Sequence, residues 1–294
     1  MRVNVTGFFK LTISVCALLI AGCEKQLEGD SFEESLSRGY AELTVVYIPT
    51  SGFAYEDENG DLTGVAIDIL KEFADFVYHS QGIDIHYHFE ADSEFSSFYN
   101  KVKNGHKGVF GIGNVTITER RKLELKFSPP YLTNIAVLIS HSDTPPLREM
   151  NTISEDFKNM TGLTLEGTLH EDRMKNLKET YWEDLKIEFV RGNSELLNRV
   201  SNGQNYFGYI DIYNFWIAAE QGASIQQHSV GELASERFGI IMPLDSDWDD
   251  LITDFFDHGQ GFRTSRIYRA ILEKHLGTEL TEKLERARLE ANQF

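Results

Sequence analysis

The stretch Thr116-Ile117-Thr118-Glu119-Arg120-Arg121, with Phe127-Ser128-Pro129-Pro130-Tyr131 close behind it, says most about the fold and the chemistry of this chain. It places a hydroxyl group, on Thr116, and a guanidinium group, on Arg121, beside the start of a helix predicted over 118–125. Arginine presents a planar fork of donors, and the first turn of a helix has free N–H groups, so both can bind a carboxylate. We therefore predict that Thr116 and Arg121 hold the carboxylate of a small molecule.

The same residues also allow a purely structural interpretation. Thr116 and Glu119 have the spacing of a capping box, and Thr118 is alternatively placed to cap the helix by itself. In either case Arg121 would be solvated and would bind nothing. The motif alone favours this structural interpretation, and only the match of the residues around it reverses the preference.

Outward from this stretch, strand-like and helix-like segments alternate along the chain. Short runs rich in β-branched and aromatic residues are followed by apolar residues at helical spacing, which is typical of β-then-α units. Two such groups in series predict an α/β fold with two lobes. The predicted strands are 43–48, 83–89, 109–112, 163–165, 187–190 and 207–210, and the predicted helices are 67–77, 95–102, 118–125, 171–179 and 194–201.

This organisation and the motif at 116–131 together resemble the family 3 extracellular solute-binding proteins, the amino-acid receptors of bacterial ABC importers. Members of that family have Thr-Ile-Thr-Pro-Glu-Arg at this point, then Asp-Phe-Ser and Pro-Tyr, which places Arg121 on the family's arginine. The resemblance runs from about Leu43 to about Gly277. It implies a two-lobed periplasmic binding protein fold of type II, with two chain crossings at the hinge.

The resemblance also implies where the lobes divide. Residues 40–134 and 235–294 would form lobe 1, and residues 135–234 would form lobe 2. The chain would cross between them near 131–137 and again near 224–236. Binding by this fold works through hinge closure, because the ligand contacts both lobes and the second set of contacts stabilises the closed state.

Three further ligand residues follow from the resemblance. Phe95 falls where the family has an aromatic side chain that stacks against the ligand; the competing interpretation is ordinary core packing. Thr168 belongs to a loop, Gly167–Glu171, that matches a ligand-binding helix start of the family, although Leu169 replaces its second hydroxyl. Asp211 occupies the place of the carboxylate that holds the ligand's α-ammonium group, with a strand-end surface aspartate as the alternative.

Departures from the family pattern leave the ligand's side chain open. Where family members often have an Asp and a Tyr after the first strand, this chain has Tyr47-Ile48-Pro49-Thr50. We expect Tyr47 to supply an aromatic wall of the site and Asn114 to add a polar contact beside Thr116. The pattern does not distinguish a cationic, a polar or an apolar amino acid. No cofactor and no metal ion is expected, since the histidines lack zinc-ligand spacing.

The first residues predict export. Arg2 and Lys10 precede an apolar run, 11–21, that is too short to span a bilayer, which is the layout of a secretory signal. The run ends in Leu19-Ile20-Ala21-Gly22-Cys23, which resembles the lipobox of bacterial lipoproteins. We therefore expect a lipoprotein signal peptide over 1–22.

Cys23 would then carry a membrane anchor. The resemblance implies that its sulfur receives a diacylglyceryl group in the cell envelope, at the inner or the outer membrane. The polar run that follows shows little apolar periodicity, so we expect a spacer over 23–39 between the lipid and the fold. Cys23 would also be the only cysteine left after cleavage, which excludes an intramolecular disulfide and a cysteine-based zinc site.

The chain is strongly acidic. Its formal charge is −18, and the predicted signal carries two of its positive charges, on Arg2 and Lys10, so residues 23–294 stand at −20. Such a surface repels phosphate backbones and acidic headgroups, which argues against nucleic-acid binding and against electrostatic adhesion to membranes. The acidic residues are spread along the chain and indicate a solubilising surface.

The resulting hypothesis is an exported, lipid-anchored binding protein for an amino acid or a similar carboxylate-bearing solute, acting with an ABC permease or with a membrane sensor. Two alternatives use the same fold. One is a dehydratase for prephenate-like acids, for which His170 and Glu171 are the nearest acid–base candidates. The other is an accessory sensory binding protein that works without a transporter.

Overall fold

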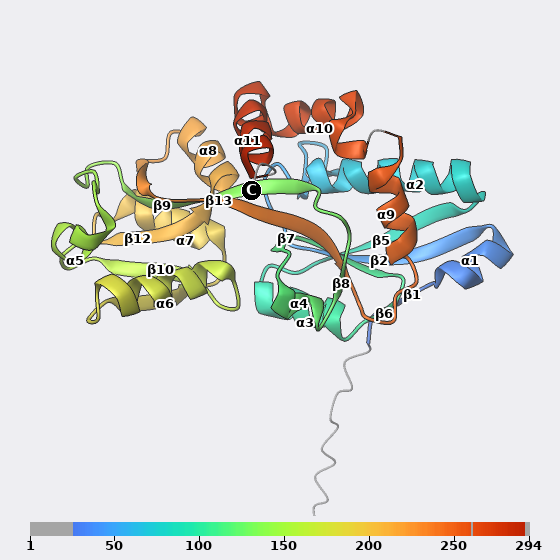
Figure 1. Ribbon diagram of the computed structural model, residues 1–294, viewed down its shortest axis with the longest axis horizontal. Coiled ribbons are helices and arrows are strands. Elements are labelled where there is room, and N and C mark those ends of the chain that lie inside the picture. The colour runs from blue at the N-terminus through green and yellow to red at the C-terminus, as the bar shows by residue number, and fades with distance from the viewer. Residues whose placement is uncertain (1–25, 260, 292–294) are drawn as a thin grey trace, which may run out of the picture.

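The structure, a computed structural model, describes residues 26–259 and 261–291, so the predicted signal peptide and Cys23 lie outside the described residues. Two lobes share one nine-stranded β-sheet (Figure 1), which confirms the predicted α/β fold with two lobes. From one edge to the other, the strands are β11 (Lys186–Val190), β10 (Thr161–Leu165), β12 (Tyr206–Asp211), β9 (Leu132–His141), β13 (Ile225–Met242), β7 (Val109–Thr116), β2 (Tyr40–Tyr47) and β5 (Asp84–Ala91), with β8 (Lys126–Phe127) beside β13.

Lobe 1 is the half built on the parallel strands β7, β2 and β5. Successive side chains of β2 point to opposite faces of the sheet, so Val45 packs under one helical layer and Val46 under the other. Trp248 and Phe73 fill the space beneath the first layer, and Phe98 fills the second. The first layer is α2 (Val65–Gln81), α9 (Asp249–Asp257) and α10 (Arg266–Leu276), and the second is α3 (Phe95–Lys103) with α4 (Glu119–Lys122).

A buried carboxylate joins two helices of the first layer. Asp68 of α2 accepts hydrogen bonds from Lys274 and His275 of α10, each at 2.7 Å, and from Lys71 at 3.0 Å. Burial opposes the charge, but these donors hold the pKa of Asp68 well below its usual range. A small hairpin, β3 (Tyr55–Glu56) and β4 (Leu62–Thr63), precedes α2.

Lobe 2 is the half built on the parallel strands β11, β10 and β12. Phe157, Phe207 and Met174 fill a separate core on one side of these strands. The helices of lobe 2 are α5 (Ile153–Asp156), which follows a 3-10 turn (Met150–Thr152), and α6 (Leu169–Tyr181), α7 (Asn193–Asn202) and α8 (Ile212–Glu220). Each predicted helix of this half is therefore present.

The strands β9 and β13 belong to both lobes. They pair with each other in antiparallel fashion, with register shifts beyond His228 and beyond Ala234. In addition, β9 pairs with β12 of lobe 2, whereas β13 pairs with β7 of lobe 1. The helix α11 (Thr278–Ala291) lies across both strands and buries Leu280 and Leu284 against the fold (Figure 1). The predicted lobe boundaries thus fall inside two shared strands.

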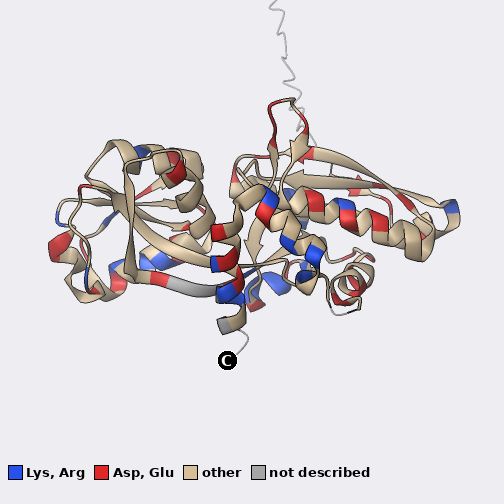
Figure 2. Cartoon of the chain, turned by 90° about the horizontal axis from the view of Figure 1, so that it is seen from above, with Lys and Arg blue, Asp and Glu red and all other residues tan. Residues whose placement is uncertain are grey.

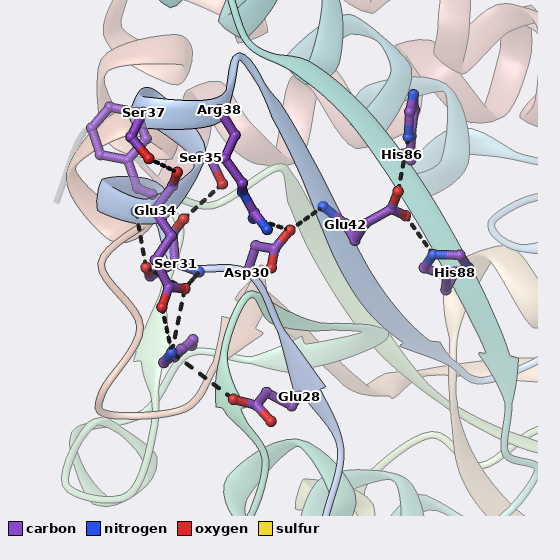
Figure 3. Close-up of polar contacts among 12 residues, drawn as sticks. Glu28, Asp30, Ser31, Glu34, Ser35, Ser37, Arg38, Glu42, His86 and His88 are labelled. Atoms are coloured by element: carbon purple, nitrogen blue, oxygen red, sulfur yellow. Dashed lines mark hydrogen bonds and ion pairs between the residues drawn. The ribbon is translucent and has the colours of Figure 1, made fainter.

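The polar run predicted to be a spacer over 23–39 is instead folded from Glu28 onward. Its elements are β1 (Glu28–Gly29) and α1 (Phe32–Arg38), and β1 pairs with β6 (His106–Lys107). Ser31 and Glu34 form a capping box at the start of α1, as Figure 3 shows, and Lys107 binds the carboxylate of Glu34 at 3.0 Å. Low apolar periodicity therefore did not mean absence of structure here.

Two contacts hold this segment on lobe 1. The carboxylate of Asp247 accepts hydrogen bonds from the N–H groups of Phe32, at 2.8 Å, and Glu33, at 3.1 Å, and so satisfies the free first turn of α1. The indole N–H of Trp248 donates to the carbonyl of Asp30 at 2.8 Å, and its ring packs against Phe32 with centroids 5.4 Å apart. The segment is therefore an integral part of lobe 1.

Charged side chains are distributed over both lobes. Figure 2 shows Asp and Glu on helices of each lobe, interspersed with Lys and Arg. This distribution agrees with a solubilising role for the acidic residues. None of the helices in the described part of the chain is both long enough and apolar enough to cross a bilayer.

A buried histidine in lobe 2 makes the fold sensitive to acid. His228 is 2% exposed; its Nδ1 accepts a hydrogen bond from the N–H of Leu147 at 3.0 Å, and its Nε2 lies 2.8 Å from Oγ of Ser140. Burial lowers the pKa of His228 from 6.5 to about 4. The unfolded chain therefore binds a proton at this residue at a higher pH than the folded chain does, and stability is lost as the pH falls from 6.5 towards 4.

We expect the thermal midpoint of the wild type to fall more steeply between pH 6.5 and pH 4 than that of His228→Gln, because only the wild type must keep a buried imidazole neutral. Circular dichroism at a series of pH values measures both slopes. His79→Gln changes an exposed histidine of α2 and should follow the wild type. Equal slopes for the wild type and His228→Gln would contradict the prediction.

Candidate functional site

A cleft of about 610 Å³ lies between the lobes. It forms where the parallel strands end, because the carboxyl ends of β2, β5 and β7 face those of β10, β11 and β12 across it. The helices α6, α7 and α8 begin at the same edge, since each directly follows one of the lobe 2 strands. Residues that mark these strand ends in the lining are Ile48, Ser93 and Thr116 of lobe 1 and Leu165, Arg191 and Asp211 of lobe 2.

Six of the seven predicted ligand residues line this cleft. They are Phe95, Asn114, Thr116 and Arg121 of lobe 1 and Thr168 and Asp211 of lobe 2. The structure thus brings together, on both sides of one cavity, side chains that are widely separated in the sequence. Such a concave site between two lobes, with a few convergent polar groups, is the usual setting for a small ligand.

Tyr47 does not line the cleft, and its expected role as an aromatic wall is corrected by the structure. It is the last residue of β2 and still pairs in the ladder, with Ala91 on one side and Ile112 on the other. A paired strand residue points to a face of the sheet and not off its end. The ring is therefore 8% exposed in the core, edge-on to Phe89 at 6.3 Å, and Ile48 takes the place at the cleft.

Arg121 is a buried cation without a carboxylate partner. It is 4% exposed; its Nη1 donates to the carbonyl of Thr116 at 3.0 Å, and its Nη2 donates to the carbonyl of Gly167 in the opposite lobe at 3.2 Å. No carboxylate of residues 26–259 or 261–291 lies within 4.0 Å of it, and burial lowers the pKa of Arg121. Thr118 does cap the helix, yet Arg121 is not solvated, and its guanidinium lies 5.3 Å from the ring centre of Phe95.

Asp211 is the corresponding buried anion. It ends β12, is 9% exposed, and accepts hydrogen bonds from Nδ2 of Asn134 at 2.5 Å and from the hydroxyl of Tyr213 at 3.2 Å. Nε2 of His170 lies 3.3 Å from the same carboxylate. Among the residues that the structure describes, no lysine or arginine comes within 4.0 Å of it. The cleft therefore contains one buried cation and one buried carboxylate that lack full counter-charges.

Thr168 caps α6, and its hydroxyl forms its hydrogen bonds within lobe 2. The oxygen accepts a hydrogen bond from the N–H of Glu171 at 3.4 Å, and the hydroxyl donates to the carbonyl of Leu165 at 2.8 Å. A hydroxyl has a single proton to donate. What this loop offers to the cleft is accordingly the first turn of α6, where Leu169 and His170 line the cavity and backbone N–H groups are free.

The sequence did not indicate four residues that surround Asp211, namely Asn134, Arg173, Tyr213 and Glu236. Asn134 of β9 donates to Glu236 of β13 at 2.8 Å as well as to Asp211, and Arg173 of α6 forms an ion pair with Glu236. The side-chain amide of Asn134 thus lies between two buried carboxylates, one at the end of β12 in lobe 2 and one on the shared strand β13. Tyr213 had a local signal, because it lies two residues after Asp211 at a helix start; the others lie in strands and helices distant in the sequence.

The two lobes touch across the cleft. Nδ2 of Asn114 donates to the hydroxyl of Tyr213 at 2.7 Å, and the ring of Tyr213 packs on Phe53 with centroids 4.3 Å apart. The bond between Arg121 and Gly167 adds a third bridge. Gly167 has φ of +75°, a left-handed conformation that favours glycine. The arrangement described here is a closed one.

His170 and Glu171, the candidates for dehydratase chemistry, have different surroundings. His170 lines the cleft beside Asp211. Glu171 lies outside the cleft lining; its carboxylate accepts a hydrogen bond from the N–H of Gly167 at 2.7 Å and pairs with Lys175 at 2.6 Å. Burial opposes this charge, but the two donors lower the pKa of Glu171. These are the contacts of a helix-start partner, not of a proton donor in a cleft.

The two lobes, their shared strands and the cleft between them define a two-lobed binding protein. The chain matches the model of the bacterial extracellular solute-binding proteins, family 3, over residues 43–278. The chain belongs to this family.

Several solved structures have a similar fold. "An ancestral arginine-binding protein bound to arginine" has a TM-score of 0.66 and is 22% identical, over 80% of this chain and 98% of that one. The ancestral amino acid-binding protein AncCDT-1, a precursor of cyclohexadienyl dehydratase, has a TM-score of 0.64 at 19% identity, over 83% and 98%. The arginine-, lysine-, histidine-binding protein ArtJ from Geobacillus stearothermophilus has a TM-score of 0.61 at 18% identity, over 84% and 99%. At this identity the likeness shows the fold.

Curated relatives include a longer enzyme. Membrane-bound lytic murein transglycosylase F of Pseudomonas putida (strain GB-1) is 23% identical over 213 residues, which are 70% of this chain and 41% of the relative. A second one, from Pseudomonas putida (strain W619), is 22% identical over 215 residues, with the same shares. The chain thus spans about two fifths of the length of these relatives.

The ion pair of Arg173 with Glu236 predicts a large loss of stability when one partner is removed. Arg173→Met leaves the carboxylate of Glu236, 8% exposed, without a cation, and we expect the free energy of unfolding to fall by about 3 to 5 kcal/mol. The double variant Arg173→Met with Glu236→Gln removes the buried charge too and should regain most of this loss. Urea denaturation measures both; a double variant no more stable than the single one would contradict the prediction.

Proposed function

We propose that this chain captures a zwitterionic amino acid in the cleft and closes its lobes around it. The observation that carries the proposal is the pair of buried charges, the guanidinium of Arg121 and the carboxylate of Asp211. Among the described residues, Arg121 has no carboxylate within 4.0 Å and Asp211 has no lysine or arginine, although Nε2 of His170 lies 3.3 Å from Asp211. A buried charge without a partner is costly, and a ligand that brings the opposite charge offsets that cost. A free amino acid has both a carboxylate group and an ammonium group attached to its α-carbon.

In the proposed complex, Arg121 and the hydroxyl of Thr116 bind the α-carboxylate, together with the first turn of α6 after Thr168. Asp211 binds the α-ammonium group. Phe95 and Asn114 contact the bound molecule from lobe 1. Because Arg121 and Thr116 belong to lobe 1 whereas α6 and Asp211 belong to lobe 2, the ligand contacts both lobes and stabilises the closed arrangement more than the open one.

A thermal shift assay tests this proposal. An L-amino acid is expected to raise the thermal midpoint of the wild type, since a ligand at a hundred times its Kd stabilises the folded state by about 2.7 kcal/mol. Arg121→Ala and Asp211→Asn should each abolish the shift, because each removes one counter-charge. Arg120→Ala, a change at the exposed neighbour on α4, is the matched control and should retain it. No shift of the wild type with any common amino acid would overturn the proposal.

The lipid anchor at Cys23 and delivery of the ligand to an ABC permease are the second part of the proposal, with a membrane sensor as the alternative recipient. The lipobox-like sequence and the membership in an extracellular family support it. The carbonyl of Leu27 already accepts a hydrogen bond from the N–H of His106 at 3.0 Å. Only residues 24–26 would therefore link the lipid to the fold, with a reach of about 14 Å from the Cα of Cys23 to that of Leu27 at full extension.

A tether this short would hold one particular edge of lobe 1 against the membrane. That edge carries β1 and β6, and α3 and α4 lie along it as well (Figure 1). An ion pair links α3 to α4: Lys103 of α3 lies 3.2 Å from the carboxylate of Glu124, just beyond the end of α4. In Figure 1, α4, which contributes Arg121 to the cleft lining, lies on the same side of the molecule as β1 and β6, so the mouth of the cleft would face the bilayer and a permease within it.

Site-directed fluorescence on the lipidated protein in phospholipid vesicles tests this orientation. A fluorophore at Leu123→Cys, a position 79% exposed just after α4, should transfer energy to an acceptor in the lipid headgroups. The same fluorophore at Tyr78→Cys, 56% exposed on α2, should transfer little. A long Gly/Ser insertion after Gln26 should erase the difference. Equal transfer from both positions without the insertion would contradict the short tether.

A further inference from the structure

The part of the cleft beyond Arg121 and Asp211 indicates the side chain of the ligand, an inference that rests on the proposed function. Among the lining residues that are at least nine-tenths buried, the only other carboxylate is Glu236, and Arg173 already neutralises it. The remaining charged residues of the lining are Arg191, which is exposed, and Glu195, which is half-buried. The buried lining of the cleft apart from Arg121 and Asp211, which we call the deep wall, therefore carries no net charge.

Asn214 is a buried polar side chain of that wall. It lies in the first turn of α8, is 8% exposed and lines the cleft. Its Nδ2 is buried and has no hydrogen-bond partner among the residues that the structure describes. Ala218, one turn further along the same face of α8, lines the cleft too. This face of α8 thus presents a methyl group and an amide that lacks a partner, and native proteins rarely leave buried amides unpaired.

Asn193 repeats this feature on the neighbouring helix. It lies in the first turn of α7, lines the cleft, and its buried Oδ1 has no hydrogen-bond partner within 26–259 or 261–291. The two ends of an amide are interchangeable in assignment, so each asparagine is best matched by a group that both donates and accepts. An ammonium or guanidinium group only donates, a carboxylate only accepts, and a hydrocarbon does neither.

We propose that the cleft selects an amino acid whose side chain ends in a primary carboxamide, glutamine or asparagine, and that Asn214 recognises this group. A carboxamide has one acceptor and two donors, so it can bond both Oδ1 of Asn193 on α7 and Nδ2 of Asn214 on α8. Leu197 and Ile217, which also line the cleft, pack against the methylene groups of the ligand. A cationic side chain finds no carboxylate in the deep wall, and an apolar one leaves both amides unpaired.

Isothermal titration calorimetry tests the inference. The wild type should bind L-glutamine or L-asparagine more tightly than L-leucine, L-lysine and L-glutamate. Asn214→Leu, which has the same number of side-chain heavy atoms and the same branching, should weaken binding of the carboxamide ligand by about ten- to a hundred-fold and leave that of L-leucine unchanged or tighter. Asn214→Asp places a carboxylate at the same position and should shift the preference to L-lysine. Asn198→Leu, on the exposed side of α7, is the control and should behave as the wild type.

Folding of these variants is measured separately. Because Nδ2 of Asn214 has no partner in the described residues, leucine should leave the thermal midpoint of the unliganded protein unchanged or raise it, and aspartate in the first turn of a helix is favoured by the helix dipole. If an amino acid binds through Arg121 but Asn214→Leu leaves the ratio of carboxamide to leucine affinity unchanged, the inference is overturned and the proposed function stands. Tighter binding of lysine or leucine by the wild type overturns it equally. If no amino acid binds, the proposed function itself fails.

Discussion

A single amide, on Asn134, separates two buried carboxylates where the chain passes between the lobes. Asp211 ends a strand of lobe 2 and Glu236 lies on the strand that returns to lobe 1, and two carboxylates in a poorly hydrated site repel each other strongly without donors. Asn134 donates to both, and Arg173 neutralises one of them. The position of Asp211 in the cleft therefore depends on β9 and β13, the strands that join the lobes, so the candidate site and the connection between the lobes share these contacts.

On the lobe 1 side of the cleft, Arg121 makes a hydrogen bond that joins the two lobes. The carbonyl groups of Thr116 and Gly167 orient its guanidinium but carry only partial charge, so they hold the group without neutralising it. A ligand carboxylate brings a full charge to the same donors. Because Gly167 belongs to lobe 2, the side chain that would bind the ligand is also a bridge between the lobes. In the proposed complex, Arg121 would therefore take part both in binding the ligand and in joining the lobes.

The N-terminal segment changes what an anchor at Cys23 would do. A flexible run of residues would let a receptor rotate freely, whereas a segment docked through Asp247 and Trp248 fixes lobe 1 relative to its point of attachment. Ser31 and Glu34 have the spacing of a capping box, yet the segment was predicted to be a spacer. The docking itself was not, because its partners lie more than two hundred positions further along the chain.

The sequence by itself determined the two α/β lobes, and its resemblance to the family indicated most of the residues that line the cleft. Hydrophobic period and turn residues act locally, and Thr116 and Asp211 end strands whose carboxyl ends face each other across the cleft. The sequence misplaced Tyr47, because one further backbone pairing decides whether a strand-end side chain enters a core or a cleft. Only the tertiary structure decided that Asn134 and Glu236 surround Asp211, since the pairing of β9 with β13 brings together residues that no local pattern connects.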